Sequence, residues 1–535
     1  MLTECPLPSV LTAALSALLG VLTLLHLRRL WLQTRRITLQ HYAPGPPPKS
    51  WLAGNHADVP EHKAWYAYTE WGKKYGMYRL LSLVFDADLA IGDVIHIRIY
   101  GRHYLILNSV VAATDLLEKR ARIYSDRPPS LMLDIKGWLF ATGFKPYGDS
   151  WRRHRRLLQQ AFKLDSLVAY RPIQTRKVND MLYGILTAPK EFTSFYKSVS
   201  AAIVMSVMYD YDLAPQNDRY VSHAEKAMAA LSDPAFSSLV DIIPGFRYLP
   251  AWFPGASFRQ EAAKIRAETD AMLEIAEQFV KKKMAEGHDL PCLMTDLMKY
   301  CKSQEDYDIL KEAAATGYVA GADTTSSALG TFFYAMAAHP HVQKKAQEEI
   351  DLVVGSHRLP HWDDRPFMPY VEAVFREVIR WRAITPFGIS HCTTDDDVYR
   401  GYYIPKGTIV VPNIWGMTRD EQTYKNPEVF EPERFLTEDG QLNNDNVGYT
   451  FGFGRRICVG RHLASSTFWY AMANVLATLD IAKKKDAMGN DLPLEVEYSF
   501  ALVSHPLPFD CSVKPRSQHV AQTILDNQRA AAEML

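Results

Sequence analysis

The chain lacks several features that would place it in common functional classes. Its six cysteines, at positions 5, 292, 301, 392, 458 and 511, include no C-x-x-C pair, which argues against a zinc site or disulfide framework and indicates a reducing compartment. Lysine plus arginine and aspartate plus glutamate both number 60, so nothing predicts binding to nucleic acid. We find no internal repeat, no low-complexity block and no flavin- or nicotinamide-binding domain.

The N-terminal region carries the longest apolar run. Residues 10–27 contain no formal charge and would span about 27 Å as a helix at ~1.5 Å per residue, enough to cross a bilayer. Arg28, Arg29, Arg35 and Arg36 follow, and positive charge stays cytosolic. We therefore predict a single-pass anchor, with residues 1–9 in the lumen and the rest in the cytosol. A cleaved signal peptide is the alternative, disfavoured by Glu4 and the lack of an A-x-A site.

After the anchor, residues 28–50 form a basic linker that ends in Pro44-Gly-Pro-Pro-Pro48, an extended, stiff connector. The rest is mainly helical in pattern, with helices expected at 259–287, 308–338, 340–354, 368–382 and 462–480. Alternation predicts two short strands in 94–107 and a hairpin-like pair in 399–411. The fold class is therefore mainly α with small β-sheets, ending in a tail at 516–535.

The most informative segment reads Phe451-Gly-Phe-Gly-Arg-Arg-Ile-Cys458-Val-Gly460. Its glycines let the backbone turn tightly and approach a flat ligand. Backbone N–H groups, the arginines and the start of the following helix all favour negative charge on sulfur. A thiolate so placed can ligate a metal, so Cys458 is the candidate metal ligand; a buried free cysteine beside a helix is the alternative.

The spacing F-x-x-G-x-R-x-C-x-G resembles the haem-binding loop of the cytochrome P450 superfamily, and the resemblance covers residues 45–515. In overall sequence the chain is most similar to fungal, microsomal class II members of the secondary-metabolism type, such as O-methylsterigmatocystin oxidoreductase-like enzymes. The resemblance implies the P450 fold and haem b bound through Cys458. It also implies that the propionates of the haem lie near four side chains: Trp151, Arg155, His391 and Arg456.

Two further motifs gain meaning from the resemblance. Asp323 and Thr324, in a helical segment, match the family's acid and alcohol pair, which relays protons during oxygen activation; alone, the motif would suit a kinked or capped helix. Glu377 and Arg380 lie three residues apart on one helical face. With Arg434 they match the family's Glu-Arg-Arg network, to which we assign stability of the cysteine loop rather than chemistry.

The implied activity is insertion of one oxygen atom from O2 into a lipophilic small molecule, with NADPH electrons supplied by a separate NADPH–cytochrome P450 reductase. Cytochrome b5 is a second candidate donor. Arg152, Arg153 and Arg156 are candidate docking contacts. The implied location is the endoplasmic reticulum membrane, and the pocket is expected from segments 127–144, 239–258, 313–324, 384–389 and 499–503. We expect a fungal secondary metabolite such as a terpenoid or aromatic polyketide. The alternatives are a haem-thiolate isomerase or dehydratase without a reductase, or an inactive or sensor haem protein.

Residues 77–92 depart from the family pattern. Fungal relatives run from Lys-Lys-Tyr-Gly76 almost directly into Asp93, whereas here sixteen residues rich in large apolar side chains intervene. A surface loop that exposed them would forgo roughly 1.5–3 kcal/mol for each large side chain. We hypothesise a retained intron, because Gly76-Met77-Tyr78 can be encoded with the fungal donor GTATGT. The alternative is a genuine insertion that contacts the membrane.

Overall fold

The structure is a computed structural model of the 535-residue chain, and it describes the greater part of it. The described residues are 20, 21, 23, 24, 41–80, 92–214, 218–229, 239–242, 245, 248, 258–355 and 357–533. The predicted lumenal segment, nearly all of the predicted anchor at 10–27 and residues 81–91 of the anomalous segment lie outside them. Among the described residues, no helix is both long enough and apolar enough to span a membrane.

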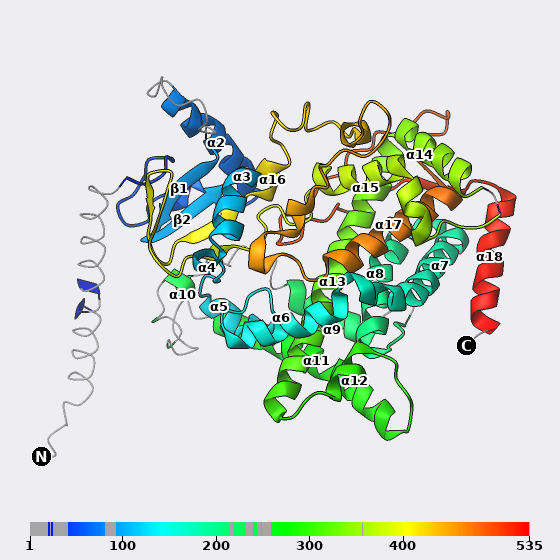
Figure 1. Cartoon of the computed structure of the whole chain (residues 1–535), viewed down its shortest axis with the longest axis horizontal. Coiled ribbons are helices and arrows are strands. Elements are labelled where there is room, and N and C mark those ends of the chain that lie inside the picture. The colour runs from blue at the N-terminus through cyan, green and yellow to red at the C-terminus, as the bar shows by residue number, and fades with distance from the viewer. Residues whose placement is uncertain are drawn as a thin grey trace, which may run out of the picture.

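Helices dominate the molecule (Figure 1). The helical bounds are α2 Ala64–Leu80, α3 Val110–Ala113, α4 Ala121–Tyr124, α5 Leu131–Ile135, α6 Asp149–Phe162, α7 Arg171–Thr187, α8 Phe192–Tyr209, α9 Arg219–Ala229, α10 Leu239–Ile242, α11 Phe258–Ala285, α12 Leu293–Met298, α13 Gln304–Ala338, α14 Pro340–Val353, α15 Pro369–Trp381, α16 Ile414–Met417, α17 Arg461–Thr478 and α18 Gln518–Glu533. Five of these correspond closely to the helices predicted from periodicity: α11, α13, α14, α15 and α17.

Three small sheets accompany the helices. The strand bounds are β1 Val94–Ile99, β2 Arg102–Leu107, β3 His391–Cys392, β4 Asp397–Tyr399, β5 Tyr402–Ile404, β6 Ile409–Pro412, β7 Leu479–Ala482 and β8 Ser512–Pro515. The four-stranded sheet has the order β1-β2-β6-β3, with β2 and β6 parallel and the other neighbours antiparallel. It lies at the end of the molecule where α2 packs (Figure 1).

The predicted hairpin-like pair within 399–411 is wrong in its pairing. β5 pairs with β4, whereas β6 joins β2 and β3 in the larger sheet. Local alternation predicts both strands correctly but carries no information on partners. Next to the β3–β6 pair, the N–H of Thr408 donates to the hydroxyl of Thr393 at 2.9 Å.

Helix α13 runs through the centre of the fold and packs closely against α8. A Cβ at Gly317 would lie 1.8 Å from Met208 Cε, and one at Gly321 would lie 2.7 Å from Val204 Cγ2. The hydroxyl of Ser200 on α8 also donates to the carbonyl of Gly321 at 2.6 Å. Both glycines therefore permit close contact between two helices. Gly321 thus faces α8.

The proline-rich linker and the C-terminal segment both pack on the body of the protein. A Cβ at Gly45 in the proline-rich linker would lie 2.0 Å from the carbonyl oxygen of His96, so glycine permits the linker to lie directly on β1. At the other end, the residues assigned to a tail form α18, which packs on α7 (Figure 1). Its Ile524 is buried, and Gln528 donates to Asp180 at 3.1 Å.

Candidate active site

Two short 3-10 turns, Gly448–Phe451 and Gly454–Arg456, precede Cys458 in the cysteine loop. Helix α17 begins three residues after it. Gly454 has φ +53°, and a Cβ there would lie 2.2 Å from the carbonyl oxygen of Leu117, so only glycine permits this contact. The N–H of Cys458 donates to the carbonyl of Phe451 at 2.8 Å, which closes the turn. The loop is thus held from both sides, and Cys458 lies two residues before the N-cap of the helix, Gly460.

The Cys458 side chain is exposed, yet burial is the largest cause acting on its thiol and raises its pKa. Both statements hold if the side chain opens into an internal hollow rather than onto the outer surface. The N–H groups of Gly460 and Arg461 and the charges of Arg155 and Arg461 lower the pKa. The expected anion-stabilising groups are therefore present, and a metal bound to sulfur replaces the proton outright.

Exposure inside the fold also occurs on α13, which would form another wall of such a hollow. Ala320 lies in the middle of this long helix but is exposed, although most side chains around it are buried. A central helix that leaves an alanine uncovered has space beside it that the chain itself does not fill. The next residues, Gly321 to Thr324, are partly exposed. This is where the sequence places the acid and alcohol pair.

Several cationic side chains gather near the cysteine loop. Arg456 is buried and donates to the carbonyls of Ser125, Thr142 and Lys145, at 2.8, 3.4 and 2.9 Å, while its guanidinium lies 4.4 Å from the ring centroid of Trp151. Burial lowers the pKa of Arg456 to about 10. All three acceptors are uncharged, so these contacts place the guanidinium without neutralising it.

Arg155 and His391 belong to the same cluster. Arg155 donates to the carbonyl of Ile457 at 2.5 Å, and its buried Nε has no partner among the described residues. His391 is buried with Nδ1 at 2.7 Å from the carbonyl oxygen of Tyr124. Burial, and next the charge of Arg127, hold the pKa of His391 well below its usual value, which favours a neutral imidazole.

Arg127 was predicted only as the first residue of a pocket segment, yet it belongs to this cluster. It is buried and donates to the carbonyls of Gly143, Ile389 and Ser390, at 2.7–2.8 Å. Burial, and then the charge of Arg456, lower the pKa of Arg127 well below its usual value. No sequence signal distinguishes a buried arginine after an aspartate and before two prolines from a solvated one.

The donor set of this cluster fits a group with two carboxylates. Within the described residues, Arg127, Arg155 and Arg456 form no ion pair with a carboxylate, and Arg155 keeps an unsatisfied buried N–H. The nearest acid, Asp126, already accepts the N–H of Tyr147 at 2.7 Å. Buried guanidinium groups that donate only to carbonyls are suited to an anionic ligand. The propionates of haem meet that requirement, with Cys458 as the sulfur ligand.

Asp323 and Thr324 do not contact each other through their side chains. Thr324 Oγ1 donates to the carbonyl of Ala320 at 2.8 Å, one turn earlier on α13. Asp323 Oδ1 instead lies 3.0 Å from Nε2 of His505, which comes from the segment after β7. The sequence places both residues on the correct helix, but it gives no sign of His505.

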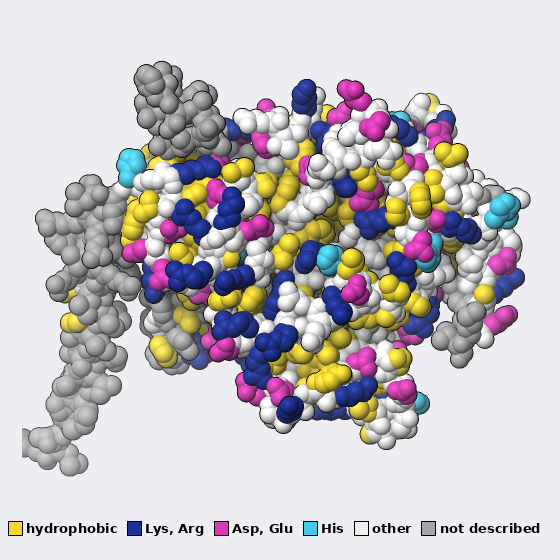
Figure 2. Space-filling model, viewed as in Figure 1, with side chains coloured by type: hydrophobic (Ala, Val, Ile, Leu, Met, Phe, Trp, Pro, Cys, Tyr) yellow, Lys and Arg dark blue, Asp and Glu magenta, His cyan; other side chains and the backbone are white. Residues whose placement is uncertain are grey.

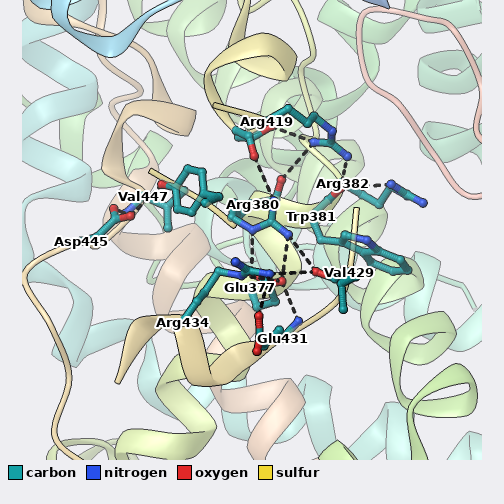
Figure 3. A network of polar contacts seen from close by, with 12 residues as sticks. Glu377, Arg380, Trp381, Arg382, Arg419, Val429, Glu431, Arg434, Asp445 and Val447 are labelled. Carbon is teal, nitrogen blue, oxygen red and sulfur yellow. Dashed lines mark hydrogen bonds and ion pairs between the residues drawn. The ribbon is translucent and has the colours of Figure 1, made fainter. Parts of the chain in front are cut away.

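The predicted Glu-Arg-Arg network is present and closed (Figure 3). Arg380 donates to both oxygens of Glu377, at 2.6 and 2.8 Å, and Arg434 donates to Oε1 at 3.2 Å. Glu377 and Arg380 are fully buried. The N–H of Glu431 also donates to Glu377, and the Glu431 carboxylate lies 3.2 Å from Arg434. In this network, two arginines therefore form ion pairs with two glutamates.

A surface hollow of about 390 Å³ lies elsewhere, between α2 and the segment that follows α16. Charged and polar side chains such as Glu70, Lys73, Arg419 and Glu428 line much of it. These residues are unsuited to a lipophilic molecule and lie outside the cysteine loop and the pocket segments. This hollow is therefore not the candidate active site.

Together, the fold and site define a class of helical protein in which a cysteine loop lies beside buried arginines suited to a dianionic cofactor. Residues 44–512 match the family model described as Cytochrome P450. The chain is 40% identical over 504 residues, 92% of this chain and 93% of the relative, to Cytochrome P450 monooxygenase ple1 of Rhodocybe pseudopiperita. It is 36% identical to Cytochrome P450 monooxygenase 176 of Postia placenta, over 92% and 94% of the two chains. It is 35% identical to Cytochrome P450 monooxygenase COX1 of Coprinopsis cinerea, over 90% and 92%.

The chain belongs to the cytochrome P450 family and is an oxygenase enzyme. The family implies haem and O2. This outcome confirms the resemblance drawn from the cysteine loop, and the names of the relatives favour a monooxygenase over an isomerase, dehydratase or sensor.

Proposed function

We propose that this protein inserts one oxygen atom from O2 into a lipophilic small molecule, with electrons from NADPH delivered by a separate reductase. The observation that supports this most strongly is the pairing of Cys458, open to an internal hollow, with buried arginines that lack a carboxylate partner. No described residue supplies that anion. A fungal secondary metabolite, such as a terpenoid or aromatic polyketide, is the proposed substrate class.

In this proposal, the residues divide into three roles. Cys458 binds the iron, and Trp151, Arg155, His391, Arg456 and Arg127 hold the propionates. When bound, haem supplies the oxygen-activating chemistry, and a thiolate ligand favours O–O cleavage. Asp323 and Thr324 deliver protons to the hollow on the α13 side. Glu377, Arg380 and Arg434 hold the segment before the cysteine loop and take no part in the reaction.

Binding of carbon monoxide to the reduced protein tests the site. A thiolate-ligated haem gives a Soret band near ~450 nm, and we expect this band in the natural protein and its loss in Cys458→Ala. Arg455→Ala, which changes the exposed arginine of the loop, is the matched control and should keep the band. A folded, haem-loaded protein without the band would contradict the proposal.

Turnover tests the substrate and the electron donor. Terpenoid and aromatic polyketide panels are incubated with NADPH and the reductase, with and without cytochrome b5, and the products are identified by mass. We expect ¹⁸O from ¹⁸O2 in the product and no product without the reductase. A product formed equally well without NADPH would favour an isomerase or dehydratase. Microsomal fractionation tests the proposed anchoring in the endoplasmic reticulum.

The anomalous segment bears on which protein the cell makes. Residues 77–80 form the end of α2, and Gly92 returns the chain beside Gly72 of the same helix, where a Cβ would lie 2.8 Å from the Gly92 oxygen. Gly92 thus lies about one turn of α2 from Gly76, so a direct connection between the two sides of the segment is short, which supports the retained-intron hypothesis. Sequencing of the transcript tests it, and a spliced message that still encodes residues 77–92 would overturn it.

A further inference from the structure

The Asp323 side chain is held by a residue outside its own helix. His505 Nε2 lies 3.0 Å from Asp323 Oδ1, and both side chains are about one quarter exposed, 25% and 28%. No other described residue has an ion pair with Asp323. We infer that His505 is a positioning residue for the proton relay: it fixes the Asp323 carboxylate by one oxygen and leaves the other oxygen for proton transfer toward Thr324. The inference rests on the proposed function.

The backbone around His505 is well fixed. The N–H of His505 donates to Ser499 Oγ at 2.9 Å, and the N–H of Ser499 donates back to the carbonyl of His505 at 2.8 Å. Ser504, the preceding residue, donates its N–H to the carbonyl of Ile384 at 2.8 Å. A ring attached to so constrained a turn has few positions available, which is what a positioning residue needs.

The turn is also attached to α13 itself. Ser327 donates to the carbonyl of Ser504 at 2.6 Å, and Tyr498 donates to Thr331 at 3.1 Å. One turn away, a Cβ at Gly330 would lie 2.8 Å from Pro506. Three contacts along α13 thus fix the position of His505 along this helix, next to Asp323. The contact is built by the fold and is not a chance meeting of surface side chains.

The position of Asp323 decides whether the relay is complete. Thr324 Oγ1 donates to the carbonyl of Ala320 and lies on the partly exposed stretch of α13. The Asp323 carboxylate has no hydrogen bond to that hydroxyl, so its placement depends on His505. In the relay, Asp323 accepts a proton from solvent on its free oxygen and passes it to Thr324 Oγ1, whose own proton leaves the Ala320 carbonyl for the O2-derived oxygen that would be reduced in the hollow; Asp323 ends ionised, as it began. No electron is transferred in this step.

The test replaces His505 and compares it with a similar pair elsewhere. His505→Phe keeps a ring but removes the donor, whereas His505→Gln retains an N–H. The matched control is His223→Phe, because His223 Nδ1 lies 2.6 Å from Glu268 Oε2 with similar exposures of 25% and 31%, between α9 and α11. Product formed per NADPH should fall about tenfold in His505→Phe, below the ~100-fold or more that loss of a relay group costs. His505→Gln and His223→Phe should stay within about twofold of the natural protein.

A second readout does not depend on turnover. The infrared stretching band of carbon monoxide on the reduced protein reports charge in the hollow beside α13. The band should shift in His505→Phe and Asp323→Asn, and should match the natural protein in His223→Phe. In the Asp323→Asn background, His505→Phe should change neither readout further, because its effect passes through Asp323. If His505→Phe fails to bind haem, His505→Ala replaces it.

The outcomes separate this inference from the proposed function. A natural protein without the ~450 nm band or without NADPH-dependent product would defeat the proposed function itself. With both present, an unchanged product yield and an unchanged carbon monoxide band in His505→Phe would overturn the role of His505. An equal loss from His505→Phe with and without Asp323 would also overturn it, since the two residues would then act independently.

Discussion

Arg380 and Arg434 lie with Glu377 and Glu431 in a network where two positive charges meet two negative ones, whereas Arg127 and Arg456 donate to carbonyl oxygens alone. Glu377 and Arg380 in the first set are buried, and so are Arg127 and Arg456 in the second. The first set is closed, because each of its arginines forms an ion pair with at least one carboxylate. The second, with Arg155, is open, because its arginines form no ion pair with a carboxylate among the described residues.

The difference separates two uses of buried arginine. A buried charge is costly unless it is paired. The closed network needs no partner from outside, so it contributes to the fold before any ligand binds. The open cluster is complete only with an anion, which is why we assign it to haem. Substitutions in the two sets should therefore change different properties, stability in one and haem affinity in the other.

The largest expected effect is on the closed network. Glu377→Gln leaves Arg380 without its charged partner, and loss of one member of a buried ion pair typically costs ~3–5 kcal/mol. We expect a sharp fall in soluble yield and in the temperature of thermal unfolding, measured by circular dichroism. Lys345→Gln removes one side of a half-exposed pair with Glu433 at 2.9 Å and should cost less than about 1 kcal/mol. Equal losses in the two variants would contradict a special role for the network.

The second prediction concerns the open cluster. Arg127→Gln and Arg456→Gln each remove a charge that would donate to a propionate, and such a hydrogen bond contributes ~1.5–3 kcal/mol. We expect haem to dissociate roughly 10–100-fold faster into an excess of apomyoglobin, in keeping with that energy. The thermal stability of the haem-free protein should fall far less than in Glu377→Gln. Haem retention equal to that of the natural protein would place the propionates elsewhere.

The two sets of arginines also differ in what the sequence could predict, because one is recognised from local spacing and the other depends on distant contacts. Glu377 and Arg380 lie three residues apart on one helix, and Cys458 lies in a glycine-rich loop, so local spacing identifies them. Arg127 and His505 act through contacts with segments more than a hundred residues away, at Ile389 and at Asp323. Strand pairing in 399–411 failed for the same reason, since β6 pairs with β2 across about three hundred residues. Local patterns do not encode such distant partners.

The third prediction uses the histidine of the open cluster. Burial and the neighbouring Arg127, then Arg456, hold the pKa of His391 well below its usual value. The folded state therefore binds this proton less readily than the unfolded state, whose histidine titrates near ~6.5. Stability is fully present above that pH and falls as pH decreases below it, by up to about 1.4 kcal/mol per pH unit for this group.

Unfolding by urea at pH 7, 6 and 5 tests this expectation on the haem-free protein. His391→Gln should show a shallower loss of unfolding free energy with acid than the natural protein. The remaining slope comes from other buried histidines, including His96 and His103, whose pKa values burial lowers to about 3 and about 4. The closed network contains no histidine, so it contributes no histidine titration to this slope. An identical slope in His391→Gln would show that His391 does not titrate in this range.

The smallest expected effect lies on α6, where Lys and Arg side chains are frequent on the face shown in Figure 2. Here too, arginines divide into paired and unpaired. Arg153 contacts Glu305 and Asp306 of α13, and Arg152 contacts Asp149, whereas exposed Arg156 has no ion pair among the described residues. An unpaired charge is available to an acidic reductase without first breaking an internal contact.

Arg156→Glu should therefore raise the reductase concentration needed for half-maximal turnover about threefold, more than Arg153→Glu, as expected for a charge at the rim of an interface. Both effects should vanish at high salt; a larger effect of Arg153→Glu would show that its internal partners do not withhold it from the reductase.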